Sequence, residues 1–106
     1  MLVELQEQHS EVNVIYVDIY EIMVSILTHP SSLGFTKTNV ACCGAGGKYN
    51  YRPQVFCGDY ERGSRPRKEP GKYVFWDEWH ISQVASKQIA KRMIPKILKA
   101  LTCAPS

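Results

Sequence analysis

The sequence predicts an α/β fold whose parallel sheet is incomplete in this chain of 106 residues. Residues 12–20 are almost continuously apolar and rich in β-branched and aromatic side chains, as in a strand that is covered on both faces. An amphipathic helix is predicted after Ser82. A single strand needs sheet neighbours for its backbone N–H and C=O groups, and residues 73–75 form too short a stretch to supply them. We therefore expect the end of a fold and not the whole of one.

Short helices are predicted before an irregular middle region. Residues 2–9 have the pattern of the last turns of a helix. Residues 21–27 predict a second short helix, which Pro30 ends. Residues 31–72 are punctuated by glycine and proline, so we expect no regular structure there. So long an irregular stretch either wraps a larger body or is held by disulfides.

The final predicted helix carries much of the positive charge of a chain whose net charge is +3. The Ser82 hydroxyl is a suitable N-cap, and Pro95 is expected to kink the helix or end its regular part near Ile94. Residues 62–106 hold ten Lys or Arg against three Asp or Glu, whereas residues 1–61 hold three against seven. Such asymmetry occurs in proteins that bind nucleic acid or anionic membranes. A solvated helix face explains it more simply, and no nucleic-acid partner is expected.

The sequence contains no segment of the kind that targets or anchors a protein. No run approaches eighteen apolar residues, so no transmembrane segment is predicted. The first nine residues are acidic and amide-rich where a signal peptide has a basic region followed by an apolar one. A protein that truly began at Met1 would therefore be cytoplasmic.

Four cysteines, at positions 42, 43, 57 and 103, allow two disulfides in an oxidising compartment. They form no C-x-x-C pair and no histidine lies near them at zinc-finger spacing, so neither a metal site nor a cofactor is predicted. A bond between the neighbours Cys42 and Cys43 would be strained, so each of them needs another partner.

The segment D-E-W-H at residues 77–80 is the candidate site. A carboxylate and an imidazole three residues apart in a turn can meet. Asp77 would then bind one ring N–H of His80 and leave the other ring nitrogen free as a base. These are the orienting and basic members of a Ser-His-Asp triad. The alternative is a locally hydrogen-bonded histidine near a helix N-terminus, because D-x-x-H often occurs by chance.

Three ordered motifs place this segment in a wider pattern. They are A-C-C-G-A-G-G-K-Y-N at 41–50, C-G at 57–58 and P-G-K-Y-V-F-W-D-E-W-H-I-S at 70–82. Together they resemble the C-terminal third of plant GDSL-type esterase/lipases of the SGNH hydrolase superfamily. The pattern of that family runs A-C-C-G-x-G-G-x-Y-N, then C-G, then P-x-K-Y-x-x-W-D-x-x-H-x-[ST]. The resemblance covers roughly residues 1–94.

The resemblance implies the C-terminal portion of a three-layer α/β/α, flavodoxin-like SGNH-hydrolase fold, with residues 1–106 as one partial domain. It also implies acyl transfer through a serine, with His80 moving the proton and Asp77 orienting His80. The substrate would be a lipid or small-molecule ester, met in the secretory pathway or outside the cell once the missing N-terminal part completes the site. Trp76 and Trp79 would either wall the site or lie in the core.

The chain also departs from the family pattern. No G-D-S motif occurs, and the blocks that hold the oxyanion-hole Gly and Asn are absent. The family's second cysteine, in C-x-x-P, is replaced by Arg67, which would leave Cys57 as a free thiol. Two functions remain: the C-terminal part of an ester hydrolase, or a catalytically inactive truncated remnant that acts as a binding or interaction protein. The sequence sets no oligomeric state.

Overall fold

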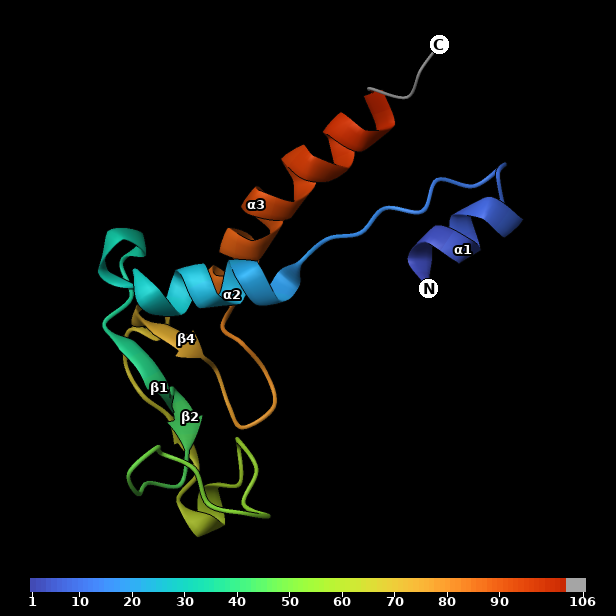
Figure 1. Cartoon of the computed structure of the whole chain (residues 1–106). Coiled ribbons are helices and arrows are strands. Elements are labelled where there is room, and N and C mark those ends of the chain that lie inside the picture. Colours follow the sequence, from blue (N-terminus) through green and yellow to red (C-terminus); the bar gives the residue numbers. More distant parts are fainter. Residues whose placement is uncertain (103–106) are drawn as a thin grey trace.

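The computed structural model describes residues 1–102, in which three α-helices and two small two-stranded sheets form the regular structure (Figure 1). The helices are α1 (Leu2–Gln8), α2 (Ile19–Thr28) and α3 (Gln83–Thr102). The strands are β1 (Lys37–Ala41), β2 (Cys43–Gly44), β3 (Arg65–Pro66) and β4 (Tyr73–Phe75). Single 3₁₀ turns lie at Ser31–Leu33, Tyr60–Arg62 and Pro70–Lys72.

The parallel sheet consists of β1 and β4. Lys37 lies opposite Tyr73 and Ala41 opposite Phe75, with an irregularity between the two pairs. The irregular region predicted over residues 31–72 therefore contains the strands β1, β2 and β3, so the expectation of no regular structure there was wrong. Residues 73–75 form β4, which pairs with β1 and not with residues 12–20. β1 and β4 are each recognisable only through the other.

Residues 12–20 do not form the predicted strand. Up to Asp18 they adopt neither helix nor strand, and α2 begins directly after this residue, whose carboxylate accepts a backbone N–H as the N-cap. The side chain of Gln6 binds two of their backbone groups, the N–H of Val14 (2.8 Å) and the C=O of Val12 (2.6 Å). No strand of residues 1–102 pairs with this segment, so its apolar sequence has no ladder to join.

The helix predictions fare better. α1 lies within the predicted residues 2–9, and α2 contains the predicted residues 21–27. The Ser82 hydroxyl accepts the Ala85 N–H (3.1 Å), as expected of an N-cap. Of the two outcomes predicted for Pro95, an end of the regular part near Ile94 was wrong, since α3 continues to Thr102, whereas a kink stays a prediction. A proline removes one hydrogen bond of the helix, and the bonds on either side can hold the rest together.

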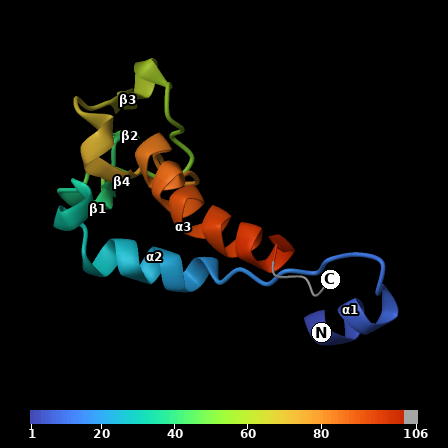
Figure 2. The same ribbon diagram turned by 90° about the horizontal axis from the view of Figure 1, so that it is seen from above.

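The core lies where α2, α3 and β4 meet. Its fully buried members are two residues of α2, one of the following loop and one each of β4 and α3, namely Ile22, Ile26, Phe35, Val74 and Ala85. Figure 1 shows α2 and α3 above β1 and β4, and Figure 2 shows that the two helices run next to each other. The core therefore fixes the start of α3 relative to the end of β4.

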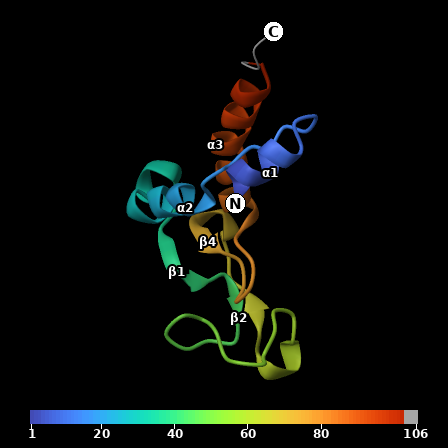
Figure 3. The ribbon, with the colours of Figure 1, turned by 45° about the vertical axis from the view of Figure 1, so that its right-hand side comes forward.

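The chain is too extended for a complete domain. Its radius of gyration is 18.2 Å, whereas a compact domain of this length has a value of about 13 Å. α1 has no buried residue, and Figure 3 shows the loops around β2 at the far end of the molecule from the last turn of α3. No helix of residues 1–102 combines the length and apolarity needed to cross a membrane. With its helices and a small parallel sheet, the fold is of the α/β kind.

Candidate active site

A tight turn between β4 and α3 carries the D-E-W-H segment. The Trp76 N–H donates to the His80 C=O (2.8 Å) and closes the turn. The Ser82 N–H donates to the Val74 C=O (2.8 Å) and fixes the returning chain against β4. The Cys43 N–H donates to the Trp76 C=O (2.7 Å), which ties the turn to the chain that follows β1. Three backbone hydrogen bonds therefore hold the candidate residues in place, one within the turn, one to β4 and one to the chain that follows β1.

The Asp77 carboxylate lies inside this turn and contacts the ring of His80. Its Oδ1 accepts the N–H groups of Trp79 (2.8 Å) and His80 (2.7 Å). The Nδ1 atom of His80 lies 2.8 Å from Oδ1 and 3.0 Å from Oδ2. The Asp77 side chain is 11% exposed and that of His80 is 71% exposed. The structure thus brings together the two residues selected from the sequence; their catalytic role stays a prediction.

Electrostatics favour the ionised form of Asp77. Burial is the largest single influence on its pKa and raises it, but the hydrogen bonds from Trp79 and His80 and the charge of His80 together lower the pKa below the ordinary value of 3.8. An ionised carboxylate only accepts hydrogen bonds, so the Nδ1 atom of His80 must be the donor. When the ring is neutral, its Nε2 atom then carries a lone pair, and no group of residues 1–102 is hydrogen-bonded to Nε2. This arrangement can accept a proton from a group placed beside Nε2.

The neighbouring side chains divide into exposed and groove-lining ones. Trp79 is 77% exposed and so lies outside the core. Trp76 is half-buried and lines a groove. Glu78 makes no ion pair with any side chain of residues 1–102. In the same part of the chain, no three metal-ligating side chains lie close enough together to hold a metal ion.

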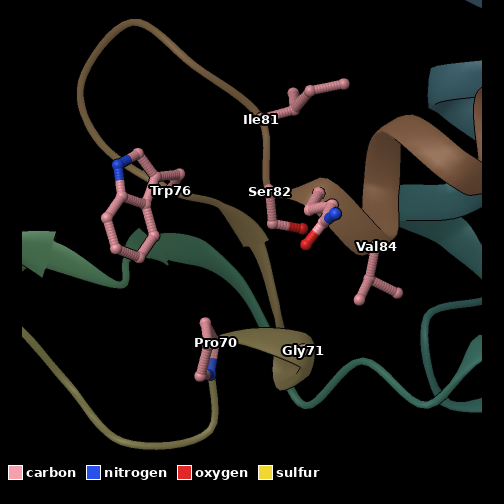
Figure 4. A pocket seen from close by; sticks show the side chains of 7 residues that line it. Pro70, Gly71, Trp76, Ile81, Ser82 and Val84 are labelled. Atoms are coloured by element: carbon pink, nitrogen blue, oxygen red, sulfur yellow. The ribbon is translucent and has the colours of Figure 1, made fainter.

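The groove beside the turn has a volume of about 380 Å³ (Figure 4). Its lining comes from the 3₁₀ turn before β4, the two arms of the D-E-W-H turn and the start of α3, with residues Pro70, Gly71, Trp76, Ile81, Ser82, Gln83 and Val84. Sequence reasoning did not identify this groove. The signal was present in the third motif, which contains both Pro70 and Trp76.

The glycine-rich motif is held in shape by the side chain of Asn50. The buried side chain of Asn50 donates to the Ala41 C=O (2.8 Å) and accepts the Gly46 N–H (2.8 Å). A Cβ atom at Gly44 would lie 1.7 Å from the backbone oxygen of Asn50, so only glycine fits there. Gly46 and Gly47 both have positive φ, the conformation that glycine allows at low cost.

The cysteines pair differently from the expectation drawn from the resemblance. Cys57 is bonded to Cys43, so the expectation of a free Cys57 thiol was wrong. The position of Arg67 lies instead beside Cys42, a buried free cysteine whose thiol is 3.4 Å from the Arg67 C=O. Arg67 therefore has no bearing on the pairing of Cys57. Cys103 lies outside the described residues.

Comparison with known proteins identifies the relatives of this chain. The family model for GDSL-like lipase/acylhydrolase matches residues 1–93. Acetylajmalan esterase 2 of Rauvolfia serpentina is 38% identical over 85% of this chain and 24% of its own length. Alpha-L-fucosidase 3 of Arabidopsis thaliana is 37% identical over 93% of this chain and 28% of its own length. The chain thus spans about a quarter of the length of these relatives. No solved structure was found to match it.

Proposed function

We propose that this chain, which belongs to the GDSL-like lipase/acylhydrolase family, supplies the proton-transfer part of a site that hydrolyses carboxylic esters. At the level of the family, the function is that of a hydrolase with esterase members. The observation that carries the proposal is the contact between the Asp77 carboxylate and the Nδ1 atom of His80, which leaves Nε2 free on an exposed ring. A serine nucleophile and the oxyanion donors would come from residues outside this chain.

The proposed reaction has two acyl-transfer steps. In the first, the Nε2 atom of His80 takes the proton of the serine hydroxyl while the serine oxygen attacks the ester carbonyl carbon. His80 gives this proton to the leaving alcohol as the C–O bond breaks, which leaves an acyl-serine. In the second, His80 takes a proton from the attacking water and returns it to the serine as the acid is released. Asp77 keeps the ring oriented and stabilises its charged form throughout.

The open edge of β1 supports a larger sheet. The Ala41 N–H donates to the Tyr49 C=O, whereas the next N–H, of Cys42, donates to β4. Because successive backbone groups of a strand point to opposite edges, those of Lys37 and Asn39 face away from β4, where no strand of residues 1–102 pairs with them. We therefore propose that residues 1–106 are one partial domain, whose sheet continues beyond β1 in a three-layer α/β/α fold.

The disulfide between Cys43 and Cys57 bears on location and substrate. Disulfides persist in oxidising compartments, so we propose a protein of the secretory pathway or the extracellular space. There its substrates would be lipid or small-molecule esters, with lipid degradation as one role.

A second candidate function is that of a catalytically inactive remnant which binds another protein. It is favoured by the absence of a G-D-S motif from the sequence and by the large apolar side chains that the chain exposes, including Tyr16, Tyr20 and Leu98. On either function, the 106-residue chain alone is expected to show no turnover of p-nitrophenyl acetate. Loss of one oxyanion donor already lowers kcat by about 10²–10³. Saturable turnover by the chain alone that His80→Ala abolishes would contradict this expectation.

The test of the proposed function is a chimera in which this chain replaces the matching segment of an active family member. We expect the chimera to hydrolyse p-nitrophenyl esters and His80→Ala to lower kcat by about 10⁴-fold or more, because no other group can move the serine proton. His29→Ala, at the exposed C-cap of α2, is the matched control and should leave kcat unchanged. An active chimera in which His80→Ala stays within a few-fold of the parent would overturn the proposal. A folded but inactive chimera would favour the remnant.

A further inference from the structure

We infer that the groove described above, the Trp76 groove, binds the uncharged acyl group of the ester that is cleaved beside His80. The inference rests on the proposed function, because it names the part of the substrate that lies next to the dyad of Asp77 and His80. Figure 4 shows Trp76 on one arm of the D-E-W-H turn and Ile81 and Ser82 on the other, with Val84 on the first turn of α3.

The groove and the dyad belong to the same rigid turn. Trp76 directly precedes Asp77, and Ile81 directly follows His80. The Trp76 N–H is bound to the His80 C=O (2.8 Å), and residue 81 forms an antiparallel bridge with Phe75. A group seated against Trp76 and Ile81 is therefore held at a fixed position relative to the ring of His80.

The chemistry of the lining selects an uncharged, largely apolar group. No lining residue carries a charge, and beside the Ser82 hydroxyl and the Gln83 amide the walls come from indole, proline and aliphatic side chains. A carboxylate or phosphate placed there would lose its hydration without gaining a cation as partner. The volume of about 380 Å³ lies near the lower end of the range of about 300–1,000 Å³ for small-molecule sites. The groove therefore fits a short acyl chain.

The walls are formed before any ligand binds. The Ser82 hydroxyl is engaged with the Ala85 N–H, and its backbone N–H is bound to the Val74 C=O. The Lys72 N–H donates to the Glu69 C=O (3.0 Å), which closes the 3₁₀ turn that presents Gly71. Binding to a preformed site saves the cost of ordering its walls.

Gly71 offers a way to fill the groove without damaging it. A Cβ atom added there would lie 3.5 Å from the Cγ2 atom of Val84, an ordinary contact, and the backbone of Gly71 is not left-handed. Gly71→Ala therefore adds one methyl group to the groove without strain. Ser86→Thr adds one methyl group to the exposed surface of α3 and is the matched control.

The first experiment measures binding without catalysis. The chain has two tryptophans, so Trp79→Phe leaves Trp76 as the sole fluorescent tryptophan of the full 106-residue chain. Titration with methyl hexanoate should change the Trp76 emission saturably. Gly71→Ala should raise Kd about tenfold, the effect of about one methylene in an apolar pocket, and Ser86→Thr should not change it. A non-saturable change, or equal Kd values for the parent and Gly71→Ala, would overturn the inference.

The second experiment separates this inference from the proposed function. In the chimera, Gly71→Ala should lower kcat/KM for p-nitrophenyl hexanoate about tenfold relative to p-nitrophenyl acetate, because only the longer acyl chain reaches the added methyl. His80→Ala should abolish both activities. If His80 is required but the hexanoate-to-acetate ratio is unchanged in Gly71→Ala, the groove inference fails alone. If His80→Ala retains activity, the proposed function fails whatever the ratio.

Discussion

The turn at residues 76–82 and the segment at residues 12–20 are both rich in aromatic or β-branched side chains, yet only the turn is folded by its own neighbours. Asp77 accepts two backbone N–H groups from within three residues and the ring of His80 as well. Between residues 12 and 17 the backbone is bound only by the side chain of Gln6 and the His9 C=O, and Tyr16 and Tyr20 stay exposed. Local hydrogen bonds thus build the candidate dyad in this chain, whereas the strand-like segment needs partners from elsewhere.

The candidate site therefore has an autonomous part, which this chain forms by itself, and a dependent part, which needs residues from elsewhere. The Asp77–His80 contact depends on residues 76–82 and on the chain next to β1, all of which lie within residues 1–102. A nucleophile would depend on a sheet that continues past β1. Substitutions in the turn should therefore act on chemistry with little effect on stability, and substitutions in its supports should do the reverse.

The largest expected effect is that of Asp77→Asn in the chimera. An amide can still accept the backbone N–H groups, but it does not stabilise the charged form of His80 and can hold the ring in the wrong tautomer. We expect kcat to fall about 10⁴-fold, as for the comparable change in a serine protease. Glu78→Gln removes a neighbouring charge that forms no ion pair within residues 1–102 and should cost no more than a few-fold. Equal losses for the two variants would move the orienting role to Glu78.

The next effect concerns the support of the turn. Gly44→Ala places a methyl group 1.7 Å from the Asn50 backbone oxygen, so the glycine-rich loop must move and the buried Asn50 side chain loses its partners. We expect the free energy of unfolding of the chimera to fall by about 2–4 kcal/mol, measured by urea denaturation. Gly71→Ala, which meets only an ordinary contact, is the control and should stay within about 0.5 kcal/mol. A neutral Gly44→Ala would show that the loop is not packed as described.

Loss of the disulfide should lower the free energy of unfolding about as much as Gly44→Ala does, and it should have little effect on the Asp77–His80 contact. Cys43 and Cys57 are 14 residues apart, and a disulfide that closes a loop of that size stabilises the folded state by about 3 kcal/mol. Cys57→Ala should therefore lower the free energy of unfolding by up to this amount, and added reductant should have no further effect on that variant. The NMR signals of the His80 ring in the 106-residue chain should be unchanged, since the turn is bound locally. A large shift of those signals would place the dyad in the dependent part.

Sequence reasoning succeeded where the structure is local. The Asp77–His80 contact spans three residues, and the final helix follows from its apolar periodicity and its Ser82 cap. It failed for β1, because K-T-N-V-A at residues 37–41 is largely polar and becomes a strand only by pairing with β4. Four cysteines allow several pairings, so the partner of Cys57 could not be selected from spacing alone. The groove was missed because its walls come from three separate elements.

The smallest expected effect is the acid sensitivity of the turn. The folded-state pKa of Asp77 is lowered, since the hydrogen bonds from Trp79 and His80 outweigh the effect of burial. A carboxyl group with a depressed pKa contributes stability above its unfolded pKa and loses that contribution as the pH falls through the folded pKa. The parent chimera should therefore lose stability relative to Asp77→Asn as the pH falls below about 4, because the asparagine does not titrate. Urea denaturation of both proteins between about pH 6 and about pH 2 measures this difference. Parallel curves over the whole range would mean that Asp77 is no better stabilised in the folded turn than in the unfolded chain, and that the local hydrogen bonds do not hold the ionised carboxylate.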